Sequence, residues 1–116
     1  MTTFSVVDPR GIRIRLTPGR LAHILELHPE VERYLSEVRR AVTDPDVIQR
    51  SRRRGDTHLY YWLRPADASR YSSLYVVVVV RLSVGGKAGR VWTAYLSRRL
   101  GKGEVLWRRP SPRSSR

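Results

Sequence analysis

The sequence predicts an α+β protein in which two N-terminal helices pack on one face of a mainly antiparallel sheet of four or five strands. Apolar residues recur at helical spacing between residues 18 and 42, and the β-prone segments follow almost entirely after Val47. With 116 residues the chain is long enough for one core and too short for two domains. We expect a single domain over residues 1–107 and a disordered basic tail over residues 108–116, which is rich in Pro, Ser and Arg.

The first strand and both helices are expected before residue 46. Apolar residues alternate with arginines over residues 12–16, which predicts a short strand. Thr17 as the cap and Pro18 as the first helical residue begin a helix that Pro29 ends. An apolar stripe over residues 31–42 predicts a second helix, because its spacing places the apolar side chains on one face.

Four further strands are expected in the rest of the chain, at residues 47–51, 58–63, 74–82 and 90–97. The third contains five consecutive valines, which indicates burial on both faces at the centre of the sheet. Glycines between the last two strands predict a hairpin turn. A loop containing Pro65 and Asp67 is expected before the valine strand.

The positive charge is confined to the later part of the chain. Residues 1–46 hold seven arginines and seven acidic residues, whereas residues 47–116 hold sixteen basic and three acidic residues, which accounts for the net charge of +13. Most of the basic residues are arginine, whose planar fork binds phosphate oxygens in pairs. A basic sheet backed by a neutral helical layer predicts a polyanionic partner, RNA above all. Codon bias in a GC-rich genome is the alternative explanation of the arginine content.

Composition excludes several kinds of site. The chain has no cysteine, so disulfides, thiolate catalysis and cysteine-ligated zinc are excluded. No two histidines stand four residues apart, and we expect neither a metal nor another cofactor. The N-terminus lacks the pattern of a secretion signal, and the longest apolar run falls far short of the roughly 20 residues that a membrane span needs. We therefore expect a cytoplasmic protein with no membrane partner.

The histidines are the candidate acid–base groups. His28 lies in the apolar stripe near the end of the first predicted helix, and His23 lies at the edge of that stripe. His58 begins a strand, and for all three a partly buried structural role is the alternative. Cleavage of RNA by internal transesterification needs a base, an acid and a cation, and it needs no metal. Histidine, arginine and tyrosine are sufficient for that chemistry.

The last predicted strand has two sets of side chains that point to opposite sides. Alternation gives one set as Trp92, Ala94 and Leu96 and the other as Val91, Thr93, Tyr95 and Ser97. If the first set packs on the helices, Thr93 and Tyr95 lie on the exposed sheet face, and Arg81 of the neighbouring strand can project there. An ordinary structural role as good strand formers is the alternative for Thr93 and Tyr95.

A cluster of arginines between two predicted strands is a candidate phosphate clamp. It consists of Arg50, Arg52, Arg53 and Arg54. Such charged loops are also commonly just solvated, which is the alternative interpretation. Aromatic residues are interleaved with the basic residues of this half of the chain. Those on the exposed face would stack on bases, which contributes roughly 1–3 kcal/mol per base.

Five short motifs resemble a known family. They are Leu16-Thr17-Pro18, His23-Ile24-Leu25, His28-Pro29-Glu30, Asp44-Pro45-Asp46 and Val91-Trp92-Thr93-Ala94-Tyr95. Together, over residues 12–107, they resemble small phage- and prophage-associated proteins grouped as nucleases of the barnase, EndoU, colicin and RelE-type fold (the BECR fold). The resemblance implies a helical layer against an antiparallel sheet and metal-independent RNA cleavage on the exposed sheet face. It points to His23 and His28 in the helix and to Thr93 and Tyr95 in the strand.

The chain departs from the family pattern near its C-terminus. RelE-type toxins often carry basic and aromatic residues there, and in this chain only Arg98, Arg99, Lys102 and Trp107 are candidates. The first hypothesis is therefore a ribonuclease, as the toxin of a toxin–antitoxin pair with an acidic antitoxin or immunity protein as partner. His23 or His28 would act as acid or base, Arg52 and Arg81 would stabilise the phosphate, and Thr93 and Tyr95 would position it or donate a proton. The alternatives are a non-catalytic nucleic-acid-binding module and an interaction protein that forms homodimers through the sheet face.

Overall fold

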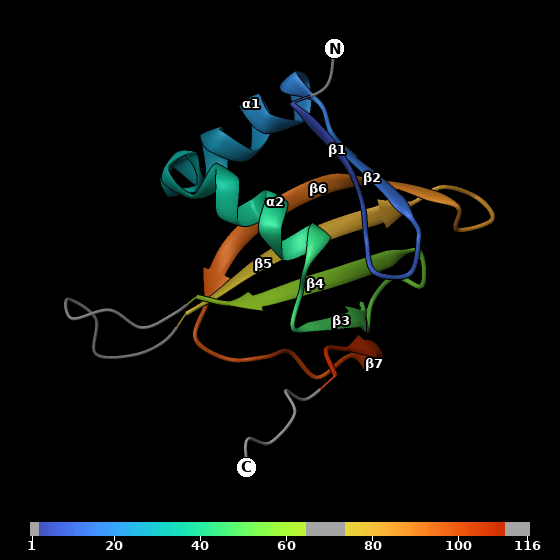
Figure 1. Ribbon diagram of the computed structural model, residues 1–116. Coiled ribbons are helices and arrows are strands. Elements are labelled where there is room, and N and C mark those ends of the chain that lie inside the picture. The colour runs from blue at the N-terminus through green and yellow to red at the C-terminus, as the bar shows by residue number, and fades with distance from the viewer. Residues whose placement is uncertain (1–2, 65–73, 111–116) are drawn as a thin grey trace.

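The computed structural model describes residues 3–64 and 74–110, and Figure 1 shows its layers. One mixed sheet has the strand order β1-β2-β6-β5-β4-β3-β7. Its strands are β1 (Phe4–Val7), β2 (Arg13–Leu16), β3 (Val47–Arg50), β4 (Thr57–Leu63), β5 (Tyr75–Leu82), β6 (Ala88–Ser97) and β7 (Glu104–Arg108). The α-helices α1 (Pro18–Leu27) and α2 (Leu35–Thr43) are joined by the 3-10 helix η1 (Pro29–Tyr34). The predicted α+β class is confirmed, although the sheet has seven strands rather than four or five.

The sheet is mostly antiparallel, with one parallel pair between β2 and β6. β5 lies at the centre, and four of its five valines are buried while Val79 is partly buried, much as their uninterrupted run predicts. The two strands that sequence analysis missed, β1 and β7, form the two outer edges of the sheet. The loop predicted around Pro65 and Asp67 lies outside the described residues.

The helical layer begins as the sequence predicts. Thr17 is the N-cap of α1, and its hydroxyl accepts a hydrogen bond of 3.2 Å from the backbone N–H of Arg20. The second α-helix starts at Leu35 rather than near residue 31, because residues 29–34 form 3-10 turns. This tighter segment turns the chain between α1 and α2 and still buries Val31.

Both α-helices cover the same face of the sheet, as Figure 1 shows. The main core lies between them and the sheet, and it includes Ile24, Val38, Ile48, Val78 and Val91. A second, smaller apolar cluster lies on the opposite face and is built on Val47, Tyr61 and Val77. We call this opposite side the open face, because no helix covers it in the described part of the chain.

A bulge in β6 decides which of its side chains reach the open face. Val80 pairs with Val91 and Val79 with Thr93, so Trp92 is the extra residue between them. The strict alternation predicted for this strand is therefore wrong before Thr93: Val91 packs into the main core, and Trp92 does not share its side. From Thr93 onward the prediction is correct, with Ala94 in the main core and Tyr95 in the open-face cluster.

Specific residues fix the turn between β5 and β6 and the segment that follows β7. The turn between β5 and β6 contains Gly85 and Gly86 with φ of 89° and 71°, which confirms the predicted glycine turn. Arg108 ends β7, and Arg109 binds Asp44 and Asp46, so the folded chain continues beyond the boundary expected at residue 107. Among the described residues, no helix is both long and apolar enough to cross a membrane.

Candidate nucleic-acid interface

The open face is organised in rows that cross the strands. Strand register aligns Tyr61, Val77 and Tyr95 in one row and Leu59, Val79 and Thr93 in the next. A third row, at the β5–β6 hairpin end, contains Thr57, Arg81, Arg90 and, on β2, Arg15. The face therefore changes along the strands from aromatic and apolar to strongly basic.

The aromatic row lines a cavity on this face, which we call the Tyr95 pocket. Its volume is about 360 Å³. Its walls combine Leu59, Tyr61 and Tyr95 of the sheet and Arg50 at the end of β3 with Arg52, Arg53 and Lys102 from two loops. Arg50 is paired with Glu104 at 3.4 Å, so three cations, Arg52, Arg53 and Lys102, remain beside an aromatic floor, an arrangement suited to a phosphate and a stacked base. Burial raises the pKa of Tyr95, with a smaller contribution from Tyr61, so its phenol keeps its proton at neutral pH.

The loop that carries Lys102 is fixed to the sheet by backbone hydrogen bonds. The Gln49 amide donates to the Gly101 carbonyl at 2.9 Å and accepts from the Gly103 N–H at 3.1 Å. The Gly101 N–H donates to the Tyr61 hydroxyl at 3.2 Å. A Cβ at Gly103 would lie 2.2 Å from the Arg50 carbonyl oxygen, and one at Gly101 would lie 2.6 Å from the Tyr61 hydroxyl. Only glycine allows so close an approach, so these two positions hold the wall of the pocket.

His28 reaches Tyr95 from the helical layer. It is the C-cap of α1, and its ring centroid lies 6.2 Å from that of Tyr95. Its Nδ1 atom is 3.7 Å from a carboxylate oxygen of Glu30, which leaves Nε2 facing away from that carboxylate. An imidazole and a phenol therefore meet beside a cluster of cations, which is the set of groups that proton transfer at a phosphate requires.

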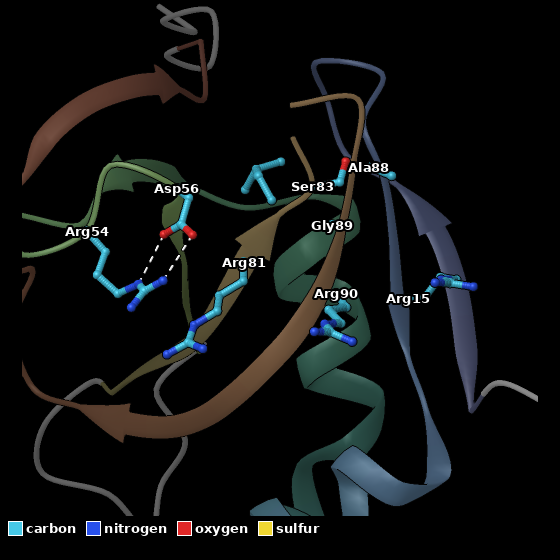
Figure 2. A pocket seen from close by; sticks show the side chains of 9 residues that line it. Arg15, Arg54, Asp56, Arg81, Ser83, Ala88, Gly89 and Arg90 are labelled. Carbon is cyan, nitrogen blue, oxygen red and sulfur yellow. Dashed lines mark hydrogen bonds and ion pairs between the residues drawn. The ribbon is translucent and has the colours of Figure 1, made fainter. Parts of the chain in front are cut away.

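The basic row lines the second cavity, the Arg81 pocket, shown in Figure 2. Its volume is about 430 Å³. Arg81 and Arg90 extend from neighbouring strands, and Arg54 is joined to Asp56 by two hydrogen bonds of 3.1 Å. Those bonds lower the pKa of Asp56 to about 2, so the carboxylate stays charged and occupied with Arg54. The other arginines of the pocket have no carboxylate within ion-pair distance among the described residues.

A stack of arginines on Trp92 borders this pocket. The guanidinium carbons of Arg20 and Arg81 each lie 3.6 Å from the centroid of the indole, and that of Arg90 lies 5.7 Å away. Two guanidinium groups at 3.6 Å from one flat ring must occupy its opposite faces. Arg20 also donates from Nε to the Trp92 carbonyl at 2.8 Å. Burial and the charges of Arg81 and Arg90 lower the pKa of Arg20.

Other charged groups are neutralised on the helix side. The Asp8 carboxylate is buried and accepts from Arg10 at 2.8 Å and from the Tyr60 hydroxyl at 2.5 Å. Burial and this bond to Asp8 raise the pKa of Tyr60 far above its ordinary range. Burial, followed by the charges of Arg10 and Arg50, lowers the pKa of His58 to about 4. His58 is therefore neutral at pH 7 and lies apart from the open face, because its partner in β5 is Val80 of the main core.

The structure brings most of the predicted site residues to the open face, in two groups. Those lining the Tyr95 pocket are Tyr95, Arg50, Arg52, Arg53 and Lys102, and those at the Arg81 pocket are Arg54 and Arg81. His28 does not line the pocket and approaches Tyr95 from the end of α1. Thr93 lies in the row between the pockets, and its hydroxyl is buried without a hydrogen-bond partner. His23 is exposed on α1, and Arg98 and Arg99 are exposed on the loop without lining either pocket.

Sequence reasoning missed the residues that complete the second site: Arg15, Arg20, Trp92 and Arg90. Arg15 and Arg20 belong to residues 1–46, where the net charge is zero. Counting charge by segment therefore gave no reason to select them. The position of Trp92 depends on a bulge that alternation does not reveal. One sequence signal was available for Arg20: its spacing from His23 and Leu27 places all three residues on one side of α1.

Asp44 and Asp46 stand in a D-x-D arrangement, and both carboxylates bind Arg109. Over residues 3–64 and 74–110, no three His, Cys, Asp or Glu side chains form a group that could hold a metal ion. In comparisons with known proteins, no family model, no curated protein and no solved structure matches the chain.

Proposed function

We propose that the chain is an endoribonuclease that cleaves RNA without a metal, with its active centre at the Tyr95 pocket. The observation that carries this proposal is the position of His28, whose ring centroid lies 6.2 Å from that of Tyr95, while Tyr95 lines a pocket together with Arg52, Arg53 and Lys102. Neither feature alone would be sufficient, because single histidines and charged loops are common in proteins without this activity.

In the proposed reaction the 2′-oxygen of a ribose attacks the adjacent phosphorus. The imidazole of His28 takes the 2′-hydroxyl proton, and the phenol of Tyr95 gives its proton to the departing 5′-oxygen. A 2′-O–P bond forms and the P–O5′ bond breaks, so the products carry a 2′,3′-cyclic phosphate and a 5′-hydroxyl. Arg52, Arg53 and Lys102 stabilise the negative charge that develops on the phosphate oxygens. The raised pKa of Tyr95 suits a group that must hold its proton until the leaving oxygen needs it.

The family resemblance points in the same direction. The motifs that resemble nucleases of the BECR fold contain His28 and Tyr95, and the structure has a helical layer with the pocket on the opposite sheet face. As the toxin of a toxin–antitoxin pair, the protein would slow growth when expressed. Its acidic partner would then cover the Tyr95 pocket. We therefore expect co-expression of such a partner to restore growth.

The test is incubation of the purified protein with an RNA oligonucleotide in EDTA, with detection of 2′,3′-cyclic phosphate ends. We expect His28→Gln and Tyr95→Phe to lower the rate by at least a hundredfold, since general acid–base groups contribute about 10²–10⁴-fold. His23→Gln is the matched control, because His23 is on the same helix but exposed. Intact RNA, or equal rates for His28→Gln and His23→Gln, would refute the proposal.

A non-catalytic nucleic-acid-binding module is the second candidate. The Arg81 pocket favours it, because this basic site has no acid–base group that titrates near neutral pH among the residues lining it. This candidate predicts RNA binding that weakens steeply with salt and no cyclic phosphate product. A dimer through the open face instead predicts sedimentation as twice the chain mass and loss of RNA binding on dimerisation.

A further inference from the structure

The arginines around Trp92 form a cluster of like charge without a counter-ion. Among the described residues, no carboxylate lies within ion-pair distance of Arg20, Arg81 or Arg90. Eight ion pairs between other described residues do join an acidic and a basic side chain. The Nε atom of Arg81 is buried and has no hydrogen-bond partner. Burial without a partner costs free energy for any polar group, and more for a charged one.

Trp92 holds two of these groups in a defined orientation. The indole lies between the guanidinium planes of Arg20 and Arg81, each 3.6 Å from its centroid. A guanidinium that stacks by its face keeps its N–H donors at its edge, where they can bind an anion. Because the stack restricts both side chains before any ligand arrives, an anion bound there would lose little affinity to side-chain ordering.

Arg81 and Arg90 of this cluster lie on the same face as the Tyr95 pocket and at a distance along the strands, and Arg20 reaches Trp92 from α1. On β5, Val77 belongs to the row of Tyr95, and Arg81 belongs to the basic row. These two residues are four apart in the sequence. At about 3.3 Å per residue the rows are separated by roughly 13 Å. Between them lie Val79 and Thr93, whose side chains on this face carry no charge. An extended strand of RNA crossing the face would meet a basic site, a neutral stretch and a second basic site.

We propose that the Trp92 cluster, formed by Arg20, Arg81 and Arg90, binds a second backbone phosphate of the single RNA strand whose scissile phosphate occupies the Tyr95 pocket. This inference rests on the proposed function, because it concerns the RNA strand that the Tyr95 pocket would cleave. It makes the substrate a single strand long enough to span both sites. It also explains why three arginines converge on the bulge of β6 while the acid of the adjoining pocket, Asp56, is paired with Arg54.

The experiment measures binding of 2′-O-methyl oligouridylates of two and eight nucleotides, which cannot be cleaved because they lack the 2′-hydroxyl. Fluorescence anisotropy of labelled oligonucleotides gives the dissociation constants over a series of salt concentrations. Arg81→Gln and Arg90→Gln remove charges from the cluster, and Arg90 is exposed, so its replacement should not disturb folding. Arg39→Gln on α2 is the matched control, since it removes one equal charge from the exposed side of the helical layer.

We expect Arg81→Gln and Arg90→Gln to weaken binding of the eight-nucleotide probe about tenfold relative to Arg39→Gln. Binding of the two-nucleotide probe should be equal in all three variants. The slope of log affinity against log salt for the longer probe should fall by about 0.7 for each lost phosphate contact, but not for Arg39→Gln. Equal affinities of the three variants for the longer probe would overturn the inference, as would equal losses for both probes.

The outcomes separate this inference from the ribonuclease proposal. If the cluster variants lose affinity for the longer probe while unmodified RNA stays intact in EDTA, the second phosphate site stands and the ribonuclease proposal fails. If RNA is cleaved and His28→Gln is inactive while the cluster variants bind normally, the ribonuclease proposal stands and the second phosphate site fails.

Discussion

The arginines of this chain fall into two regions that differ in their partners. On the helix side and at the sheet edge, Arg10, Arg64 and Arg109 each bind a carboxylate, from Asp8, Glu37 and Asp44 respectively. On the open face, Arg81 and Arg90 have no such partner among the described residues. Each arginine adds one positive charge to the total, whether or not it is paired. The comparison shows that pairing, rather than charge count, separates arginines that stabilise the fold from those available to a ligand.

The largest effect is expected when a paired arginine loses its carboxylate. Asp8→Ala would leave the Tyr60 hydroxyl and the Arg10 guanidinium without their shared partner in a buried site. We expect the free energy of unfolding to fall by about 3–5 kcal/mol, the range for removal of one member of a buried ion pair. Urea denaturation measures it. A loss below about 1 kcal/mol would show that the fold does not depend on the pairing of Arg10 with Asp8, and the contrast with the open-face arginines would fail.

A smaller effect on stability is expected at Gly103, which positions the loop that carries Lys102. A Cβ at Gly103 would meet the Arg50 carbonyl at 2.2 Å, so Gly103→Ala must displace backbone. We expect a loss of about 1–3 kcal/mol of stability, as in other overpacked sites, together with weaker RNA binding at the Tyr95 pocket. Gly19→Ala on α1 is the control, because a Cβ there has open space. Equal effects of the two substitutions would contradict the role given to the loop.

The free energy of unfolding is expected to depend on pH through His58. The pKa of His58 is lowered to about 4 in the folded chain, from 6.5, mainly by burial and then by Arg10 and Arg50. Because the folded pKa is the lower one, the unfolded chain binds the proton first, and stability falls as pH decreases from about 6.5 to 4. We expect a loss of about 1 kcal/mol between pH 7 and pH 5, since solvent screens part of the effect at this half-buried ring. Denaturation of wild type and His58→Gln at both pH values measures it, and equal pH dependence would contradict it.

The smallest effect on stability is expected on the open face itself. Arg90→Gln removes a charge that repels Arg20 and Arg81, and the exposed side chain has no carboxylate to lose among the described residues. We expect the free energy of unfolding to change by less than about 0.5 kcal/mol, or to rise slightly. Thermal melts with and without added inorganic phosphate measure it. A loss above 1 kcal/mol in the absence of phosphate would remove the distinction between the two regions.

Much of the fold follows from local signals. The cap at Thr17, the glycine turn at Gly85 and the central valine strand are each set by residues adjacent in sequence, and each was predicted correctly. The outer strands β1 and β7 were missed because each is only four or five residues long and lies at an edge of the sheet, where β1 pairs with the neighbouring β2 and β7 pairs with the distant β3.

The candidate site was predictable in its residue types but not in its grouping. Alternation placed Tyr95 on the open face, yet nothing local indicated that His28 would lie beside it, since the two are brought together by packing of α1 on β6. The bulge at Trp92 depends on the register between β5 and β6, which the sequence of β6 alone does not specify. For the same reason, the role of Arg20 emerges only when the helix is docked.

The loop that carries Lys102 is held by backbone atoms and by Gln49, not by its own charges. Its shape would therefore survive replacement of Arg98, Arg99 or Lys102, whereas it would not survive a side chain at Gly103. A search for distant relatives by basic composition would retrieve unrelated polycationic sequences. A profile that requires an amide at position 49 and glycines at positions 101 and 103 would instead select chains able to build the same wall, even where evolution has redistributed the cations.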